Sequence, residues 1–234
     1  MGKVNIITDS SAYLPKDIAK QYNVRVVPLT LHWGGASYYD GVDIEAEEFY
    51  ERLSTSKSIP TTSQVTIGQF HDVFEPLVKA GEDVLCLAMS YDISATYNSA
   101  VQAAEMLGNP PNLVVIDTRL ISMALSLMVI QVARAAEQGA RLPELQELVK
   151  DLYPRIGVYF TVNTLEYLHR GGRINSAKRL LGSALNLKPI MEIRDGKIEL
   201  VESVISSKKA TLRMIDLIEK SIDGRSPVRL GPFH

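Results

Sequence analysis

Short apolar runs alternate along most of the chain with longer segments that have helical periodicity. Such runs, bounded by turn residues, are typical of buried strands. The expected strands cover residues 3–8, 24–33, 83–89 and 113–117, and the expected helices cover 15–22, 44–53, 95–107 and 119–137, with one more that follows Thr62 and Ser63 and ends at Lys79. Strands that alternate with helices form βαβ units and a parallel sheet. We therefore expect an α/β domain over residues 1–153, with a mostly parallel sheet and helices on both faces.

The pattern changes after this first domain. Three further strands are expected, at 156–162, 187–193 and 197–205. Asp195-Gly196 separates the last two and is a strong signal for a tight hairpin turn. A helix is expected over 207–222. Adjacent paired strands with few helices between them indicate a second, α+β domain with antiparallel strands over residues 154–234.

The balance of charges argues against a nucleic-acid partner. The chain has 234 residues, of which 25 are basic and 27 acidic, and its net charge is −2. Basic residues form no stripe with interleaved aromatic side chains, which is the pattern that nucleic-acid-binding surfaces show. Hydrophobic residues make up 46% of the chain and charged residues 22%, as in an ordinary globular protein.

Neither a membrane span nor a disulfide is expected. The longest apolar region, residues 120–133, lies between Arg119 and Arg134 and is too short to cross a bilayer, so it predicts a buried helix. The N-terminus lacks the layout of a signal peptide. The one cysteine, Cys86, lies within an apolar run, which excludes a disulfide within the chain. Together these features predict a cytoplasmic protein without membrane insertion.

Two hydroxyl-rich stretches, residues 60–64 and 90–97, each lie where a helix is expected to begin. Their Ser and Thr side chains are Thr61, Thr62, Ser63, Ser90, Ser94 and Thr96. One interpretation is helix capping alone, for which a single hydroxyl is enough. The other is an anion site, because free N–H groups and the helix dipole favour a carboxylate or phosphate there. The surplus of hydroxyls favours the anion site.

Polar side chains also follow several of the expected strands. Ser10 and Ser11 follow the first strand, Ser90 follows a later one, and Asp117-Thr118 ends the next. Ligands of parallel sheets bind outside the carboxyl ends of the strands. The sequence therefore predicts that these side chains meet at one rim of the sheet.

Four motifs, in this order, resemble those of the bacterial DegV family. They are Thr8-Asp9-Ser10-Ser11, Pro60-Thr61-Thr62-Ser63-Gln64, residues 90–97 and Leu168-His169-Arg170-Gly171-Gly172-Arg173-Ile174. The resemblance extends from Lys3 to Ala210, which is nearly the whole chain. Each motif alone is weak, and the four together in order are specific.

The resemblance implies a two-domain α/β carrier that binds one long-chain fatty acid, such as palmitate, between its domains. It implies no catalytic residue, metal or cofactor in this chain, and a partner fatty-acid kinase that converts the bound acid to an acyl-phosphate. By position, Thr62 and Ser94 would bind the carboxylate. The supporting residues implied by the family are Thr61, Ser63, Ser90, Thr96, Arg170 and Arg173, the last two in a basic Arg-Gly-Gly-Arg loop.

The chain departs from the family pattern at several positions. Ala95, Ala124 and Ser126 stand where the family usually has glycines, so a narrower tunnel or a shorter or bent acyl chain is expected. Ile205 stands where family members commonly have an arginine that matters for docking of the kinase partner. Family members also continue beyond the point at which this chain ends. We therefore expect a shortened second domain and do not equate His234 with the family's histidine near the head group.

Two other functions are alternatives. The first is an enzyme that acts on a small phosphorylated or carboxylated metabolite at the same rim. Against it, the sequence shows no general base near the hydroxyls, no Gly-x-x-x-x-Gly-Lys-Ser/Thr loop, and no metal-ligand spacing of His32, His71 and His169. The second is a regulatory protein-binding module, which no sequence feature specifically supports.

Overall fold

The computed structural model describes residues 3–181 and 187–232. The chain forms two compact units, residues 1–154 and 155–234. His234, for which the sequence offers no family counterpart, lies outside the described residues.

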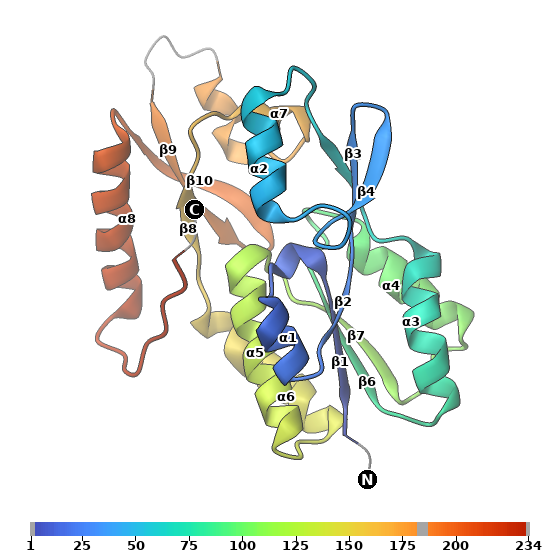
Figure 1. Cartoon of the computed structure of the whole chain (residues 1–234). Helices are drawn as coiled ribbons and strands as arrows, with labels where there is room; N and C mark the ends of the chain where they lie inside the picture. Colours follow the sequence, from blue (N-terminus) through green and yellow to red (C-terminus); the bar gives the residue numbers. More distant parts are fainter. Residues whose placement is uncertain (1–2, 182–186, 233–234) are drawn as a thin grey trace. The chain divides into compact units, whose positions relative to one another are not determined.

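The first unit is built on a four-stranded parallel sheet with the strand order β2-β1-β6-β7 (Figure 1). Its strands are β1 (Asn5–Asp9), β2 (Arg25–Val27), β6 (Val84–Ala88) and β7 (Leu113–Asp117). Every residue of β6 is buried, because a central strand of a parallel sheet is covered on both faces. The predicted parallel sheet is confirmed.

Helices cover both faces of this sheet, as predicted (Figure 1). They are α1 (Lys16–Gln21), α3 (Ile67–Lys79), α4 (Thr96–Met106), α5 (Ser122–Glu137) and α6 (Leu142–Leu152). Helices α3 and α4 pack against each other on one face, whereas α5 packs on β1 from the other face and α6 packs on α5. Helix α6 is not among the predicted elements, although its buried residues Leu142, Leu145 and Val149 have helical spacing.

The first unit also contains a three-stranded antiparallel sheet, in the order β4-β3-β5, which is not among the elements expected from the sequence. Its strands are β3 (Thr30–Trp33), β4 (Ala36–Tyr39) and β5 (Thr61–Ser63). The sheet shares a hydrophobic cluster with α2 (Ala46–Thr55), whose members are Leu31, Trp33, Ile44, Tyr38, Phe49 and Leu53. The strand expected at 24–33 is divided at Pro28 into β2 and β3, since proline cannot donate a ladder hydrogen bond.

The second unit contains an antiparallel sheet in the order β10-β9-β8. Its elements are β8 (Tyr159–Thr161), α7 (Glu166–Arg170), β9 (Lys188–Arg194), β10 (Lys197–Val204) and α8 (Ser207–Ile222), which packs on the strands. Asp195 and Gly196 join β9 to β10 with φ angles of 49° and 81°, the left-handed conformation that a two-residue hairpin turn requires. The predicted hairpin and antiparallel strands are confirmed.

The apolar region at 120–133 forms most of α5, which is 16 residues long and buries much of its surface. Within the described ranges, no helix combines the length and the apolar character needed to cross a bilayer. Cys86 is a buried free thiol in β6, and burial raises its pKa well above the ordinary value. It is a core residue of the sheet.

Candidate functional site

A buried carboxylate joins the carboxyl ends of β1 and β6. Asp9 accepts a hydrogen bond from the backbone N–H of Met89 at 2.8 Å, and others from the N–H and the hydroxyl of Ser11. Burial raises the pKa of Asp9 above its ordinary value, although these hydrogen bonds oppose the effect. Met89 directly follows β6, so Asp9 holds the ends of two neighbouring strands together.

Other hydroxyls at this rim also bond within the fold. The Ser10 hydroxyl donates to Asp40 Oδ2 at 2.7 Å and accepts from the N–H of Leu29 at 3.0 Å. The Thr118 hydroxyl donates to the carbonyl of Ala88 at 2.8 Å. The rim hydroxyls that follow β1 and β7 therefore stabilise the loops in which they lie.

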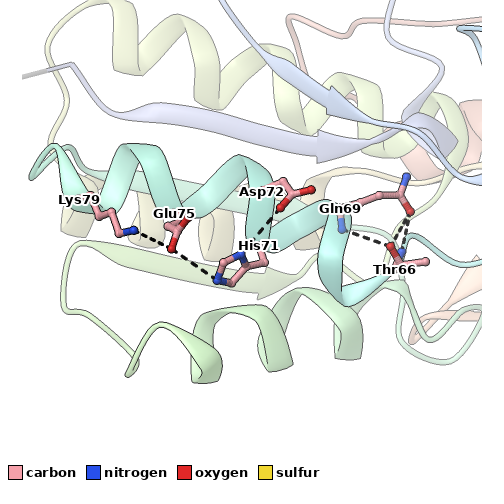
Figure 2. A network of polar contacts seen from close by, with 6 residues as sticks. All are labelled: Thr66, Gln69, His71, Asp72, Glu75 and Lys79. Atoms are coloured by element: carbon pink, nitrogen blue, oxygen red, sulfur yellow. Dashed lines mark hydrogen bonds and ion pairs between the residues drawn. The ribbon is translucent and has the colours of Figure 1, made fainter.

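Helix α3 begins later than expected from the sequence. Thr61, Thr62 and Ser63 form β5, and the N-cap of α3 is Thr66. Thr66 Oγ1 accepts from the N–H of Gln69 at 3.2 Å, and Gln69 Oε1 accepts from the N–H of Thr66 at 2.9 Å (Figure 2). The prediction that the first hydroxyl-rich stretch begins a helix is wrong, because Thr66 forms this capping box with Gln69 and the stretch itself forms β5.

A row of ionisable side chains lies along α3 (Figure 2). Glu75 Oε1 lies 2.8 Å from Lys79 Nζ and 3.9 Å from His71 Nε2. The hydrogen bond from Lys79 lowers the pKa of Glu75 below its ordinary value. Pairs spaced by four residues stabilise a helix surface, and we assign no binding role to this row.

The hydroxyls of β5 lie on two different faces of its sheet. Thr62 pairs with Leu31 and Thr61 pairs with His32 in the antiparallel register. Residues that pair directly share a face, and successive residues of a strand alternate between faces. Thr62 therefore lies on the face of Leu31, whereas Thr61 and Ser63 lie on the face of His32.

His32 connects the hydroxyls of two strands. Its Nε2 lies 2.7 Å from Ser63 Oγ on β5, and its Nδ1 lies 2.9 Å from Ser37 Oγ on β4. The expectation that no base lies near the hydroxyls is therefore wrong. Pairing of β3 with β5 brings together residues 31 positions apart, and no local motif relates them.

The second hydroxyl-rich stretch lies at the start of α4, as predicted. Ser94 Oγ accepts from the N–H of Thr96 at 3.3 Å and lies 3.0 Å from Thr96 Oγ1. Ser90 is fully buried and accepts from the N–H of Asp92, and Thr96 is also fully buried. Ser94 is only half-buried, which makes it the most accessible of the three hydroxyls predicted here.

The two stretches line one open hollow of about 630 Å³ in the first unit. Its lining residues are Ser63, Gln64, Thr66, Ile67, Gly68, Ala95, Asn98, Ser99 and Gln102. Ser63 directly follows Thr62, and Ala95 directly follows Ser94, so the segments predicted to bind a carboxylate meet at this hollow. Of these described lining residues, none is charged.

Several lining residues are absent from the sequence prediction. Asn98 and Gln102 are four residues apart on α4, and Ser99 lies beside them. A polar pair with this spacing shares one helix face, which is the signal that would have found it. Gln64 lines the hollow because it lies between the end of β5 and the start of α3.

The predicted basic residues belong to the second unit. Arg170, at the end of α7, forms an ion pair with Glu166 at 2.6 Å. Arg173 donates to the carbonyl of Gly171. Both arginine side chains are exposed.

The hollow offers neutral hydrogen-bonding groups. Hydroxyls and side-chain amides can bind an anionic or polar group without placing a full positive charge opposite it. Over residues 3–181 and 187–232, no group of three or more His, Cys, Asp or Glu side chains is placed to hold a metal ion.

Comparison with known proteins finds relatives that are similar in sequence and in structure. One relative, a DegV domain-containing protein of Caldanaerobacter subterraneus subsp. tengcongensis, is 38% identical over 221 residues, which are 94% of this chain and 78% of the relative. A fatty-acid-binding DegV family protein of Thermus thermophilus superposes with a TM-score of 0.87 at 32% identity, over 96% of this chain and 79% of that one. A stearic-acid-binding protein of Eubacterium ventriosum has the same TM-score at 30% identity, over 95% of this chain and 77% of its own.

The family comparison covers nearly the whole chain. The profile of the DegV family, described as a family of uncharacterised proteins, matches residues 3–234. This match and the relatives agree with the motifs found in the sequence, and the chain belongs to the DegV family.

Proposed function

We propose that this protein is a carrier that binds a long-chain fatty acid, with the carboxylate held by Thr62 and Ser94. The observation that carries the proposal is that the residues following these two, Ser63 and Ala95, line the same hollow. The segments that bear the two hydroxyls therefore approach each other. Solved relatives from Thermus thermophilus and Bacillus subtilis, described as fatty-acid-binding, support the ligand class.

The chemistry of the two hydroxyls suits a carboxylate. A buried carboxylate must be hydrogen-bonded, since an unpaired polar group in an apolar environment costs several kcal/mol. Thr62 is exposed on β5 and Ser94 is half-buried at the start of α4, so both hydroxyls are accessible to a ligand. The acyl tail contributes about 0.8 kcal/mol per buried CH₂ group, so the tail supplies most of the affinity and the hydroxyls set the orientation.

We further propose that the carrier presents its acid to a partner kinase. In that step a carboxylate oxygen attacks the γ-phosphorus of kinase-bound ATP, a P–O bond forms, and ADP leaves. This chain supplies no catalytic group to the step and needs no cofactor or metal of its own. Thr61, Ser63, Ser90 and Thr96 are neighbours that shape the head-group site, and the exposed loop of Arg170 and Arg173 is available to the partner. A cytoplasmic location, suggested by the single free thiol of Cys86, belongs to the same proposal.

One observation favours a second candidate, an enzyme that acts on a small carboxylated or phosphorylated metabolite. The pair of Ser63 and His32, at 2.7 Å, has the geometry of a nucleophile beside a base. The other nitrogen of His32 contacts the hydroxyl of Ser37, where hydrolases place a carboxylate that stabilises the protonated imidazole. The pair therefore lacks the group that would make His32 an effective base, and we prefer the carrier.

Native mass spectrometry of the gently purified protein tests the proposal. We expect an adduct with the mass of a fatty acid, or one that forms after incubation with palmitate or oleate. Absence of an adduct in both experiments would refute fatty-acid binding. Turnover of a metabolite by the isolated protein, lost in His32→Ala, would instead support the enzyme.

The kinase step has its own test. The loaded carrier is mixed with ATP and a candidate kinase, and hydroxylamine traps acyl-phosphate as the hydroxamate. We expect hydroxamate only when carrier, kinase and ATP are all present. Equal hydroxamate formation from free fatty acid without the carrier would contradict presentation.

A further inference from the structure

We infer that Asp117 is a positioning residue for Ser94, the proposed carboxylate ligand. Asp117 ends β7, and its side chain binds the backbone of residues 89–95, which connect β6 to α4 and are called the Ser94 loop below. This role rests on the proposed function and adds to it a residue that acts on the ligand through Ser94.

One oxygen atom of Asp117 joins two loops. Asp117 Oδ1 accepts a hydrogen bond from the N–H of Tyr91 at 3.2 Å and another from the N–H of Arg119 at 2.9 Å. Tyr91 lies three residues before Ser94, whereas Arg119 belongs to the connection between β7 and α5. The carboxylate of Asp117 therefore ties the Ser94 loop to the end of the neighbouring strand.

The connection between β7 and α5 has a conformation that supports this tie. The carbonyl of Leu120 accepts from the N–H of Ser90 at 2.9 Å. Arg119 has a φ angle of 54°, in the left-handed region that residues other than glycine rarely adopt. The bond from its N–H to Asp117 is that of an Asx turn, which stabilises such a bend. A side-chain acceptor and a backbone acceptor thus bind two consecutive residues of the Ser94 loop.

The backbone of the Ser94 loop is satisfied within the protein. The N–H groups of residues 89, 90 and 91 donate outside the loop, to Asp9, Leu120 and Asp117. The N–H groups of residues 92, 93 and 94 donate to the hydroxyl or the carbonyl of Ser90. A ligand that binds this stretch must therefore use side chains, of which the hydroxyl of Ser94 is the proposed one.

The bonds of Ser94 show why its position matters. Ser94 Oγ accepts from the N–H of Thr96 at 3.3 Å and lies 3.0 Å from Thr96 Oγ1. A hydroxyl has two lone pairs and one proton, so two donors from Thr96 can fill the lone pairs and leave the Ser94 proton for a carboxylate. Asp117 fixes the preceding part of the same loop. A group that is already in place binds its ligand without the entropic cost of ordering it.

The sign of the mutational effect separates positioning from charge. Asp117→Asn keeps an oxygen that can accept both N–H groups and removes a negative charge, so palmitate should bind at least as tightly as to the wild type. Asp117→Ala removes both the charge and the acceptor, and palmitate should bind about tenfold more weakly. If Asp117 acted only through its charge, both variants would bind the anionic ligand more tightly.

Two comparisons show that the effect passes through Ser94. In a Ser94→Ala background, Asp117→Ala should lower the affinity by less than about twofold, because the group that it positions is already absent. The matched control is Asp40→Ala, which removes another half-buried aspartate of the first unit. Asp40 accepts from the hydroxyl of Ser10 and should leave the affinity for palmitate unchanged.

Isothermal titration of the whole protein with palmitate measures these affinities, and amide hydrogen exchange without ligand measures the order of the loop. The amide of Ser94 should exchange about tenfold faster in Asp117→Ala than in the wild type or in Asp117→Asn.

The role of Asp117 is refuted if palmitate binds the wild type and Asp117→Ala equally. It is also refuted if the loss of affinity is the same in the Ser94→Ala background, or if the exchange of the Ser94 amide does not change. Failure of palmitate to bind the wild type would instead refute the proposed carrier function, and the positioning role would fall with it.

Discussion

His32 Nε2 lies 2.7 Å from Ser63 Oγ, across the pairing of β3 with β5. Ser63 lies on the face of the sheet opposite to that of its neighbour Thr62, because successive residues of a strand alternate between faces. The two residues of this Thr-Ser dipeptide therefore differ. The hydroxyl of Ser63 contacts His32, whereas Thr62 lies at an exposed strand position.

Replacing His32 should affect stability more than ligand binding. His32→Ala removes the contacts to Ser63 and Ser37 and should lower the free energy of unfolding by about 1 kcal/mol, the usual net value of a hydrogen bond. His32→Gln retains a polar atom that can reach Ser63 and should recover part of the loss. Urea denaturation measures the first quantity and fluorescent fatty-acid displacement the second. A large loss of fatty-acid affinity in His32→Ala would place His32 in the head-group site.

Thr62 and Thr66 should have opposite mutational effects. Thr62→Ala removes a proposed carboxylate ligand on an exposed strand position, so fatty-acid affinity should fall about tenfold while the thermal midpoint stays unchanged. Thr66→Ala removes the N-cap of α3 and should cost about 1 kcal/mol of stability, with little change in affinity. Isothermal titration and thermal unfolding of both variants test the pair. The carboxylate assignment fails if Thr62→Ala binds as tightly as the wild type.

Substitutions of Ser94 can separate its two roles. Ser94→Ala should lower both stability and fatty-acid affinity, because Ser94 Oγ also accepts from the N–H of Thr96. Ser94→Asp keeps an acceptor for that N–H but places a negative charge beside the ligand, so stability should be retained while binding is lost. The two variants are compared by thermal unfolding and by native mass spectrometry. Normal fatty-acid loading of Ser94→Asp would exclude Ser94 as a carboxylate ligand.

Asp9→Asn should destabilise the first unit. Both carboxylate oxygens of Asp9 accept hydrogen bonds, so the amide nitrogen of Asn would face a donor from either Ser11 or Met89. A buried unsatisfied donor costs about 1–3 kcal/mol, which chemical denaturation can measure. Asp117→Asn is the control, since Asp117 is only half-buried at the end of β7 and should cost less. Equal losses in the two variants would contradict a special role of the buried carboxylate.

The raised pKa of Asp9 also predicts how stability depends on pH. The folded-state pKa lies above the ordinary value of 3.8, so between these two values the folded protein binds more protons than the unfolded chain. The free energy of unfolding contributed by Asp9 should therefore fall as pH rises through this interval and level off above it. The difference between wild type and Asp9→Asn, measured by urea denaturation from pH 3.8 upward, isolates this contribution. A difference that grows with pH would show that the folded state instead favours the ionised carboxylate.

The sequence predicts the parallel sheet well because its strands and helices carry strong local signals. The run at 113–117 coincides with β7, and the helix expected over 95–107 is observed as α4, Thr96–Met106. The cap of α3 is mispredicted because several hydroxyls compete for it. Only the reciprocal bonds of Thr66 and Gln69 decide among them.

The candidate site is less predictable than the fold. Its hydroxyl-rich stretches are visible as motifs, but β5 is only three residues long and is defined by its pairing with β3. The contact of His32 with Ser63 and the lining by Asn98 and Gln102 depend on that pairing and on the packing of α3 against α4. The pairing of β3 with β5 leaves no local trace in a single sequence, whereas the four-residue spacing of Asn98 and Gln102 does.

The late start of α3 has an evolutionary consequence. Because Thr66 caps the helix, Thr61 and Thr62 are relieved of that duty and lie on an exposed strand. Substitutions at these two positions should therefore leave folding largely intact. Under the proposed function, the ligand preference of this stretch can change without compensating mutations elsewhere.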